Sequence, residues 1–219
     1  MKKIILATAV GLGTLDSAFA VTAQSGVYVG GNLGWSFPQT YTDSSVGTLT
    51  GSTATQSNKG FSGGAVLGYD YAINQSFLVG AELGYNYLGK TEYDLNDQGA
   101  TASISDHDTA FQILATSTYL NQNGFNAFVK AGMARLDTSV STSIPALTDA
   151  INSQGYGSVA KWLPAAAIGV GYMPMQNLNV ALQYERIFGN NSDNAITDTS
   201  NKPKTQNTVS LGVTYKFAL

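Results

Sequence analysis

Hydrophobic and polar residues alternate one by one along much of this chain, and most regularly near its end. Val209, Leu211, Val213, Tyr215 and Phe217 would lie on one face of an extended strand, with small or polar residues on the other. A strand with one apolar and one small or polar face is the repeating unit of a transmembrane β-barrel. The same alternation predicts eight strands, each of about the 9–11 residues that a tilted membrane strand needs. They span residues 26–37, 61–71, 76–87, 109–119, 125–136, 162–173, 178–188 and 207–217.

The connections between these strands alternate in length. The short ones are residues 72–75, 120–124 and 174–177, and the long ones are residues 38–59, 88–108, 137–161 and 189–206. Tight turns on one side and long loops on the other are typical of outer-membrane barrels. The long connections are rich in Ser, Thr, Asn, Asp and Gly, which predicts solvated loops. We therefore expect an all-β fold, an eight-stranded antiparallel up-and-down transmembrane β-barrel with short periplasmic turns, four long extracellular loops and both termini in the periplasm.

The two faces of the predicted strands differ in composition. Aromatic residues gather at strand ends on the apolar face, as in the belts at membrane interfaces. The other face carries many of the 24 glycines and few ions, because charged residues make up only 11% of the chain, against about 25% in a typical soluble domain. A soluble sandwich or lipocalin is the alternative, but its solvated face would carry more charge. The predicted periplasmic belt is Tyr69, Tyr71, Phe77, Tyr119, Phe125, Tyr172, Tyr215 and Phe217, and the outer belt is Trp35, Tyr85, Tyr87, Phe111, Trp162, Tyr184 and Phe188.

The first twenty residues have the pattern of an export signal. Lys2 and Lys3 precede an apolar stretch too short to span a bilayer, and Ala18-Phe19-Ala20 matches the small-residue cleavage pattern. We expect residues 1–20 to be a signal peptide and residues 21–219 to form a single barrel domain. The full chain has a formal charge of −3, and loss of the two lysines and one aspartate of the signal would leave −4, which argues against nucleic acid as a partner. The chain has no cysteine, so it has no disulfide framework.

Four motifs connect the chain to a known family. They are GVYVGGNLGWSF at residues 26–37, GYDY at residues 68–71, FNAFVKAGMA at residues 125–134 and the ending Gly212-x-x-Tyr215-x-Phe217. With these motifs the chain resembles the small OmpA-like and opacity-type outer-membrane β-barrels over nearly its whole length after the signal. The resemblance implies a monomer in the outer membrane of a Gram-negative bacterium, surrounded by lipid and lipopolysaccharide, without the peptidoglycan-binding domain of full-length OmpA.

The ending has a second expected role. Gly212, Tyr215 and Phe217 look like the assembly signal that the barrel-insertion machinery reads in this family. The family usually stops at the aromatic residue, whereas Ala218 and Leu219 follow here.

Several charged residues are predicted to point into the lumen. By strand alternation Glu82, Lys130 and Glu185 all face inward near the middle of their strands. Gln112, Gln183, Asp70 and Lys216 share that face. An unpaired charge in a dry lumen costs several kcal/mol, so we expect Lys130 to lie between the two glutamates. The structural interpretation is a plug of ion pairs, since an eight-stranded barrel is just wide enough for its side chains to fill. The alternative is a gate in a narrow pore.

Candidates for chemistry are few. His107 is the only histidine and lies between Asp106 and Asp108. Outer-membrane barrel enzymes, among them lipid A acylases, lipid A deacylases and proteases, resemble this fold, and several of them use a histidine near the outer rim. Neighbouring residues of a strand face opposite ways, however, so the aspartates need not converge on the ring. Acidic pairs such as Asp94 and Asp97, or Asp193 and Asp198, have no defined metal-binding spacing. We expect no catalytic residues, no cofactor and no metal.

The sequence thus leaves three classes of function open. The first is a non-enzymatic outer-membrane protein with a structural and surface-interaction role, in which extracellular loops contact host surface molecules or the environment. The second is a lipid-modifying enzyme that uses His107. The third is a narrow gated pore.

Overall fold

The computed structural model describes residues 20–38, 53–97, 100–142, 158–189 and 205–218. The predicted signal peptide falls almost entirely on residues 1–19, which lie outside this part. In the described residues, no helix is long and apolar enough to cross a membrane. The strands are β1 (Gly26–Pro38), β2 (Thr53–Lys59), β3 (Phe61–Ala72), β4 (Phe77–Asp97), β5 (Ala100–Leu120), β6 (Phe125–Thr142), β7 (Ser158–Met175), β8 (Leu178–Ile187) and β9 (Gln206–Ala218).

These nine segments form a closed antiparallel barrel of eight strands. Neighbours around the barrel run β1, β3, β4, β5, β6, β7, β8 and β9, and β9 pairs with β1 to close the sheet. Segment β2 does not add a ninth position, because β2 and β3 follow one another along the same edge of β4, separated only by Gly60. The break lies opposite the register shift between Tyr87 and Gly89 of β4. The predicted fold class is therefore confirmed.

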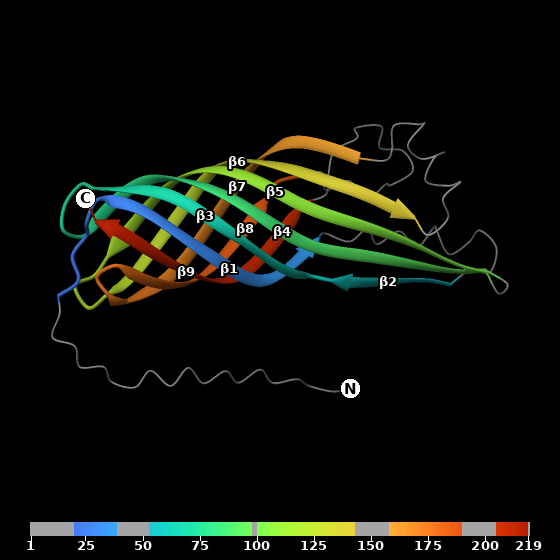
Figure 1. Ribbon diagram of the computed structural model, residues 1–219, viewed down its shortest axis with the longest axis horizontal. Helices are drawn as coiled ribbons and strands as arrows, with labels where there is room; N and C mark the ends of the chain where they lie inside the picture. Colours follow the sequence, from blue (N-terminus) through green and yellow to red (C-terminus); the bar gives the residue numbers. More distant parts are fainter. Residues whose placement is uncertain (1–19, 39–52, 98–99, 143–157, 190–204, 219) are drawn as a thin grey trace.

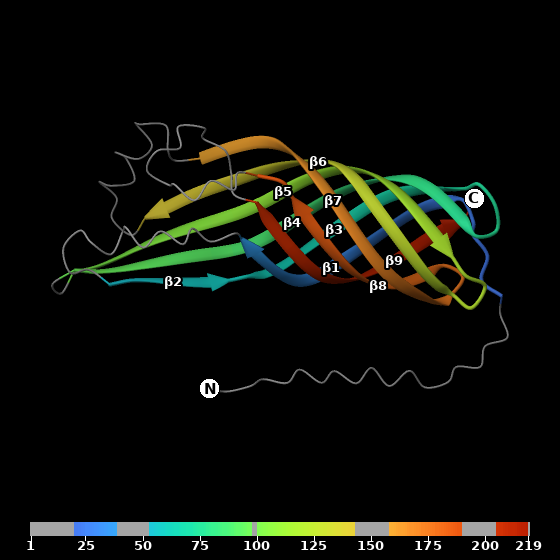
Figure 2. The same ribbon diagram turned by 180° about the vertical axis from the view of Figure 1, so that it is seen from behind.

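The strands are much longer on one side of the barrel than predicted. The connection 88–108, predicted as a loop, is a continuous β4–β5 hairpin that stays paired to Asp97 and Ala100. Likewise β2 lies within the predicted loop 38–59, and β6 and β7 extend into the predicted loop 137–161. Together β2 and the distal parts of β4, β5, β6 and β7 form what we call the projecting sheet, which stands beyond the ends of β1, β8 and β9 (Figures 1 and 2). A strand in water on both faces needs no apolar alternation, so the pattern that marks membrane strands does not detect it.

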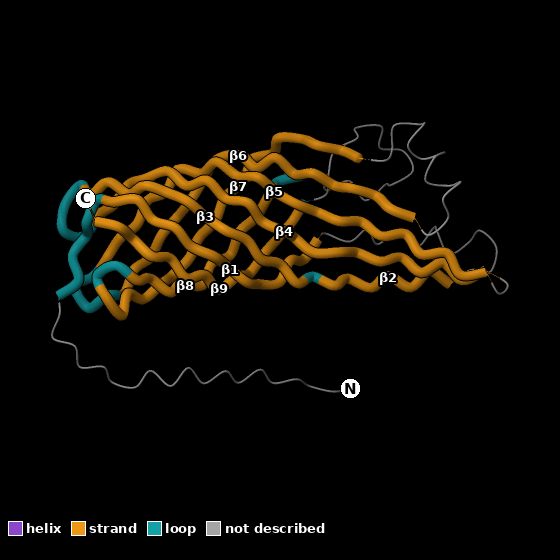
Figure 3. The backbone as a smooth tube through the Cα atoms, in the orientation of Figure 1, coloured by secondary structure: helices purple, strands orange, loops and turns teal. Residues whose placement is uncertain are grey.

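The opposite end of the barrel has the predicted short turns, which Figure 3 shows gathered at one end. In the β3–β4 turn, Asn74 Oδ1 accepts hydrogen bonds from the backbone of Ser76 and Phe77, both at 2.9 Å. In the β5–β6 turn, Gly124 has a φ of 85°, a conformation that side chains disfavour.

The inward and outward faces follow the predicted alternation. The large apolar residues assigned outward, such as Leu67, Ile168 and Leu211, are exposed on the outside of the barrel, as lipid contact requires. Aromatic rings of the periplasmic belt touch across strands, with centroids 5.1 Å apart for Phe77 and Tyr119. In the outer belt, Phe111 and Trp162 lie 6.3 Å apart, edge to face. We expect the barrel to leave the membrane at the height of this outer belt, because aromatic rings favour the membrane interface.

Candidate functional site: the barrel lumen

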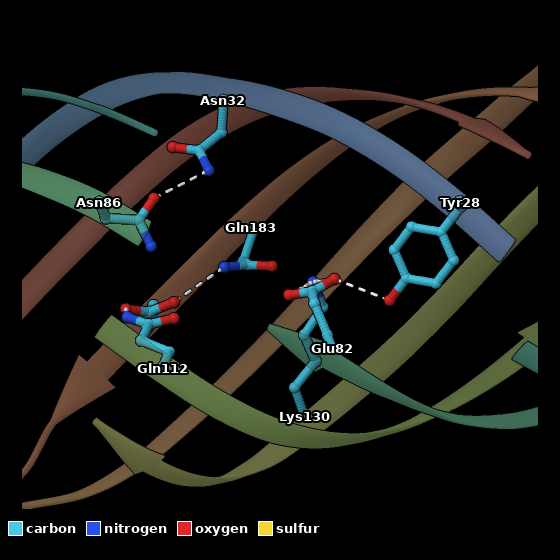
Figure 4. A network of polar contacts seen from close by, with 8 residues as sticks. Tyr28, Asn32, Glu82, Asn86, Gln112, Lys130 and Gln183 are labelled. Carbon is cyan, nitrogen blue, oxygen red and sulfur yellow. Dashed lines mark hydrogen bonds and ion pairs between the residues drawn. The ribbon is translucent and has the colours of Figure 1, made fainter. Parts of the chain in front are cut away.

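The lumen holds a partly open polar chamber in the periplasmic half of the barrel. Its cavity volume is about 110 Å³, enough for several water molecules when polar groups line the wall. Figure 4 shows the polar side chains that reach into this space from strands on opposite sides. They include Tyr28, Asn32, Glu82, Asn86, Gln112, Lys130, Gln183 and Glu185.

A buried ion pair crosses the chamber between β4 and β6. Lys130 Nζ lies 2.7 Å from Glu82 Oε1 and 2.8 Å from Glu82 Oε2, and the Tyr28 hydroxyl of β1 donates to Glu82 Oε2 at 2.9 Å (Figure 4). Glu82 is 4% exposed and the Lys130 side chain 13%. The Lys130 ammonium also lies 5.1 Å from the centre of the Phe128 ring. Glu82 thus accepts three hydrogen bonds, which offsets much of the cost of burying its charge.

Glu185, the second glutamate of the predicted network, has two glutamine side chains as hydrogen-bond partners. The Gln112 side-chain amide donates to Glu185 Oε1 at 2.5 Å, and the Gln183 amide donates to Oε2 at 3.1 Å. The structure therefore brings Lys130 onto Glu82, while two glutamine amides hold Glu185. Sequence alternation places all three charges on the inner face, but it does not determine which acid the flexible lysine reaches.

Three further polar side-chain pairs connect strands that are not neighbours in the sheet. The Asn32 amide donates to Asn86 Oδ1 at 3.0 Å, and the Asn126 amide donates to Asn179 Oδ1 at 2.9 Å. Lys216 Nζ lies 2.7 Å from Asp70 Oδ2. The asparagine pairs and Tyr28 are absent from our sequence candidates, although all occupy inward positions by strand parity. They could have been identified from the sequence as polar residues near the middle of a strand, at positions that strand alternation turns inward.

Above the chamber, eight inward residues form an apolar layer. Leu136 and Ile187 are 0% and 1% exposed, so they are among the most deeply buried side chains described. We call this group the outer apolar layer, and it consists of Leu88, Ala110, Leu114, Ala134, Leu136, Leu163, Ala165 and Ile187. It contradicts the expectation that the inner face is only small or polar. The layer lies on the side of the lumen formed by β4 to β8, and buried polar residues such as Ser36, Gln206 and Thr208 occupy the side formed by β1 and β9.

The Tyr28 ring leaves no room for a side chain at Gly68. A Cβ atom built there would overlap the ring of Tyr28, whose hydroxyl holds Glu82. We predict that Gly68→Ala lowers the free energy of unfolding by about 1–3 kcal/mol, the usual cost of overpacking, measured by urea unfolding from lipid vesicles. Gly31→Ala on β1 is the control, because a Cβ there meets only ordinary contact at 3.4 Å on the lipid side. Equal effects of the two changes would contradict the crowding of Tyr28 against Gly68.

The predicted candidates for catalysis lie at the outer rim. Asp108 Oδ2 accepts a hydrogen bond from the Gln206 amide at 2.8 Å. Because β5 is regular here, alternation turns His107 to the other face from Asp108. The side chains of Asp94, Asp97 and Asp106, and all of Asp193 and Asp198, lie outside what the structure describes. Among the described residues, no three His, Asp or Glu side chains are grouped as metal ligands.

The predicted assembly signal lies on the strand that closes the barrel. Phe217 pairs with Val27, Tyr215 with Val29 and Gly212 with Asn32 of β1. The Tyr215 and Phe217 rings pack edge to face with centroids 5.0 Å apart. Their reading by the insertion machinery stays a prediction.

Comparison with known proteins assigns the architecture. The model of the OmpA-like transmembrane domain family matches residues 22–219. An uncharacterized protein of Coxiella burnetii is 28% identical, over 94% of this chain and 90% of its own length. Among solved structures, the attachment invasion locus protein Ail of Yersinia pestis, bound to the heparin analogue sucrose octasulfate, is similar at 15% identity and a TM-score of 0.48, covering 90% of this chain and 99% of Ail. The outer membrane protein OprG of Pseudomonas aeruginosa has 16% identity and a TM-score of 0.48, with 91% and 99% covered.

Proposed function

Because the chain belongs to the OmpA-like transmembrane domain family and lies in the outer membrane of a Gram-negative bacterium, we propose that it works at the cell surface as a non-enzymatic interaction protein. In this proposal the barrel is a rigid anchor, its lumen is a structural plug that includes Glu82, Lys130 and Glu185, and the projecting sheet with its loops contacts other surfaces.

The projecting sheet is the observation that carries the proposal. Strand β4 passes the outer aromatic belt at Tyr85 and continues to Asp97, which is about 40 Å along the strand at roughly 3.3 Å a residue. Beyond the belt β4 pairs with β2 and β5, and β6 and β7 continue the sheet beside β5 (Figure 1). A membrane anchor needs strands only as long as the hydrocarbon layer is thick. The extra length presents the connecting loops well outside the lipid headgroups, where they can reach a partner.

The charge of these segments indicates what kind of partner fits. Residues 38–59, 88–108, 137–161 and 189–206 together contain ten acidic and five basic residues. Such a surface repels polyanions and favours neutral or basic partners. We therefore propose protein surfaces of the host or the extracellular matrix, rather than sulfated glycans, as the target.

Trimming the β4–β5 hairpin tests this proposal. Residues 91–106 can be replaced by an Asn-Gly turn, because Lys90 pairs with His107 and a two-residue turn fits that register. Bacteria that display the trimmed protein should adhere to immobilised fibronectin, collagen or epithelial cells no better than bacteria that lack the protein. Heat-modifiable migration on gels shows whether the trimmed barrel still folds, and a heparin surface provides the polyanionic control.

A substitution at the only histidine separates this proposal from the enzyme alternative. His107→Asn should leave adhesion unchanged, because it keeps the hairpin intact. If His107→Asn instead altered the lipid A profile of the cells, the enzyme alternative would replace our proposal. Full adhesion by the trimmed protein would also contradict it.

A further inference from the structure

A short segment before β1 crosses the periplasmic mouth of the barrel. Residues 21–25 appear as the blue trace that enters β1 in Figure 1, at the same end as the three short turns. This segment forms no β-ladder with any strand, because the sheet pairing of β1 begins at Gly26. Its contacts are instead individual hydrogen bonds and the burial of one side chain.

The segment is bonded to all three periplasmic turns. The backbone N–H of Val21 donates to the carbonyl of Gln122 at 3.1 Å, and that of Ala23 donates to the carbonyl of Gln75 at 3.0 Å. At the third turn, the N–H of Thr22 donates to Gln176 Oε1 at 3.3 Å, and Gln176 Nε2 donates back to the Thr22 carbonyl at 2.5 Å. One stretch of chain thus connects turns that are far apart in sequence.

Two more bonds fix the segment to the barrel wall. The N–H of Ala72 donates to the Ser25 hydroxyl at 2.9 Å. Lys216 Nζ, which pairs with Asp70 inside the lumen, also lies 3.4 Å from the carbonyl oxygen of Gln24. The segment is therefore anchored at both of its ends and in its middle.

The Val21 side chain completes an apolar layer across the mouth. Val21 is 6% exposed and clusters with Leu78 and Leu120, which are 4% and 2% exposed. Ala23, Ala72 and Met173 pack against this group. Leu78, Leu120 and Met173 also line the polar chamber, so this layer is the floor of the chamber. Of the three buried side chains in this layer, only Val21 comes from outside the barrel strands.

The two apolar layers that bound the chamber are built differently. The outer apolar layer consists only of side chains on barrel strands, which the hydrogen-bonded sheet holds in place. The layer at the periplasmic mouth includes Val21, which belongs to a segment that only a few separate hydrogen bonds hold in place. Local opening costs least where few buried contacts and no ladder hold the chain. The segment of residues 21–25 can therefore leave the layer at the periplasmic mouth without unfolding of the barrel.

We infer that residues 21–25 form a second plug, separate from the ion-pair plug of the lumen. It docks in the periplasmic mouth and controls the access of water and small ions to the polar chamber. When the plug is docked, it covers the periplasmic end of the chamber. When it leaves, Asp70, Lys216 and the Glu82–Lys130 pair face the periplasm, while the side chains buried near the outer rim, which belong to the barrel strands, stay in place. The plug thus makes the lumen a vestibule of the periplasm and not a channel through the membrane.

Chemical labelling inside the chamber tests this inference. Thr118 lines the chamber on β5, and the native chain has no cysteine, so Thr118→Cys is a single reporter. The reporter protein is purified from the outer membrane, and the rate of its reaction with a small cationic methanethiosulfonate reagent is followed by mass spectrometry. The same reaction in urea gives the rate for an open chain.

With the plug intact, the reporter should react far more slowly than in urea. Gln176→Ala removes both Thr22 bonds and should raise the rate about tenfold or more, as expected for the loss of two ordinary hydrogen bonds. Val21→Ser should act in the same direction by weakening the apolar floor. Ile73→Ser is the matched control, because Ile73 is a 59% exposed turn residue on the same side of the barrel, and it should leave the rate unchanged.

Two results would overturn the inference. One is a reporter that reacts as fast with the intact plug as in urea, because the mouth would then be open already. The other is an unchanged rate in Gln176→Ala while the protein stays heat-modifiable, because another element would then close the chamber. Should Val21→Ser fail to fold, Gln176→Ala still decides the question. Adhesion through the projecting sheet does not enter this experiment, so the two proposals succeed or fail separately.

Discussion

Lys130→Ala should lower the free energy of unfolding by about 3–5 kcal/mol, which is the cost of leaving a buried charge without its partner. Lys130 is the cation that contacts Glu82, and Glu82 is 4% exposed, so water cannot replace the lost ammonium without rearrangement. Urea unfolding of the protein from lipid vesicles measures the loss, and the fluorescence of Trp35 and Trp162 reports it. Glu82→Gln should cost less, because its amide oxygen can still accept the bond from Tyr28.

Double variants distinguish the two acids that the sequence treats alike. Combining Lys130→Met with Glu82→Gln should recover part of the sum of the two losses, because breaking an ion pair costs more than removing it. Combining Lys130→Met with Glu185→Gln should be closer to additive, since Gln112 and Gln183 hold Glu185. Additivity in the first pair would mean that Glu82 and Lys130 are not coupled. If Lys130→Ala instead raised bilayer conductance without loss of stability, a gate would replace the structural plug.

Leu67→Arg should lower the free energy of unfolding by about 2–4 kcal/mol, the cost of a lipid-facing arginine near the bilayer midplane. Leu67 is 49% exposed on the outer face of β3, well inside the membrane part of that strand. Phe61→Arg is the matched comparison, because Phe61 starts the same strand on the same face, beside Trp35 of the outer belt. There the cost should fall to about 0–1 kcal/mol.

The alanine variants Leu67→Ala and Phe61→Ala serve as references, so that loss of the native side chain is not counted as the cost of the charge. Unfolding from vesicles of one lipid composition gives all four values. Similar costs for arginine at the two positions would show that β3 does not cross the bilayer in the assigned way.

The lipid-facing half of the fold could be predicted from sequence because the bilayer imposes one simple rule. Every second residue of a membrane strand must be apolar, so residues such as Val79, Leu83 and Val213 identify both the strand and its outward face. The ends of β1, β8 and β9 were predicted to within a residue, because these strands stop where the apolar alternation stops. Strands β4 to β7 continue into water, where that rule no longer applies.

The interior could be predicted only in part. Alternation places Glu82, Lys130 and Glu185 inward, but the choice of partner depends on side-chain reach and on the amides of Gln112 and Gln183. The outer apolar layer was not predicted, because inward leucines such as Leu114 and Leu136 interrupt the alternation of apolar and polar residues on which the assignment of faces rests. The docking of residues 21–25 has no periodic signal, since it rests on backbone hydrogen bonds to three separate turns.

Spin labels along β4 test most directly that this strand leaves the membrane at the outer belt and continues as a sheet in water. The native chain has no cysteine, so single cysteines from Val79 to Asn96 can each carry one label without background. We predict that outward positions up to Tyr85 are accessible to oxygen, which concentrates in lipid, and that positions beyond Gly89 are accessible to a water-soluble nickel chelate. All of them should show the restricted motion of strand residues. Oxygen access that extends to position 96, or the free motion of a loop beyond Gly89, would contradict the account.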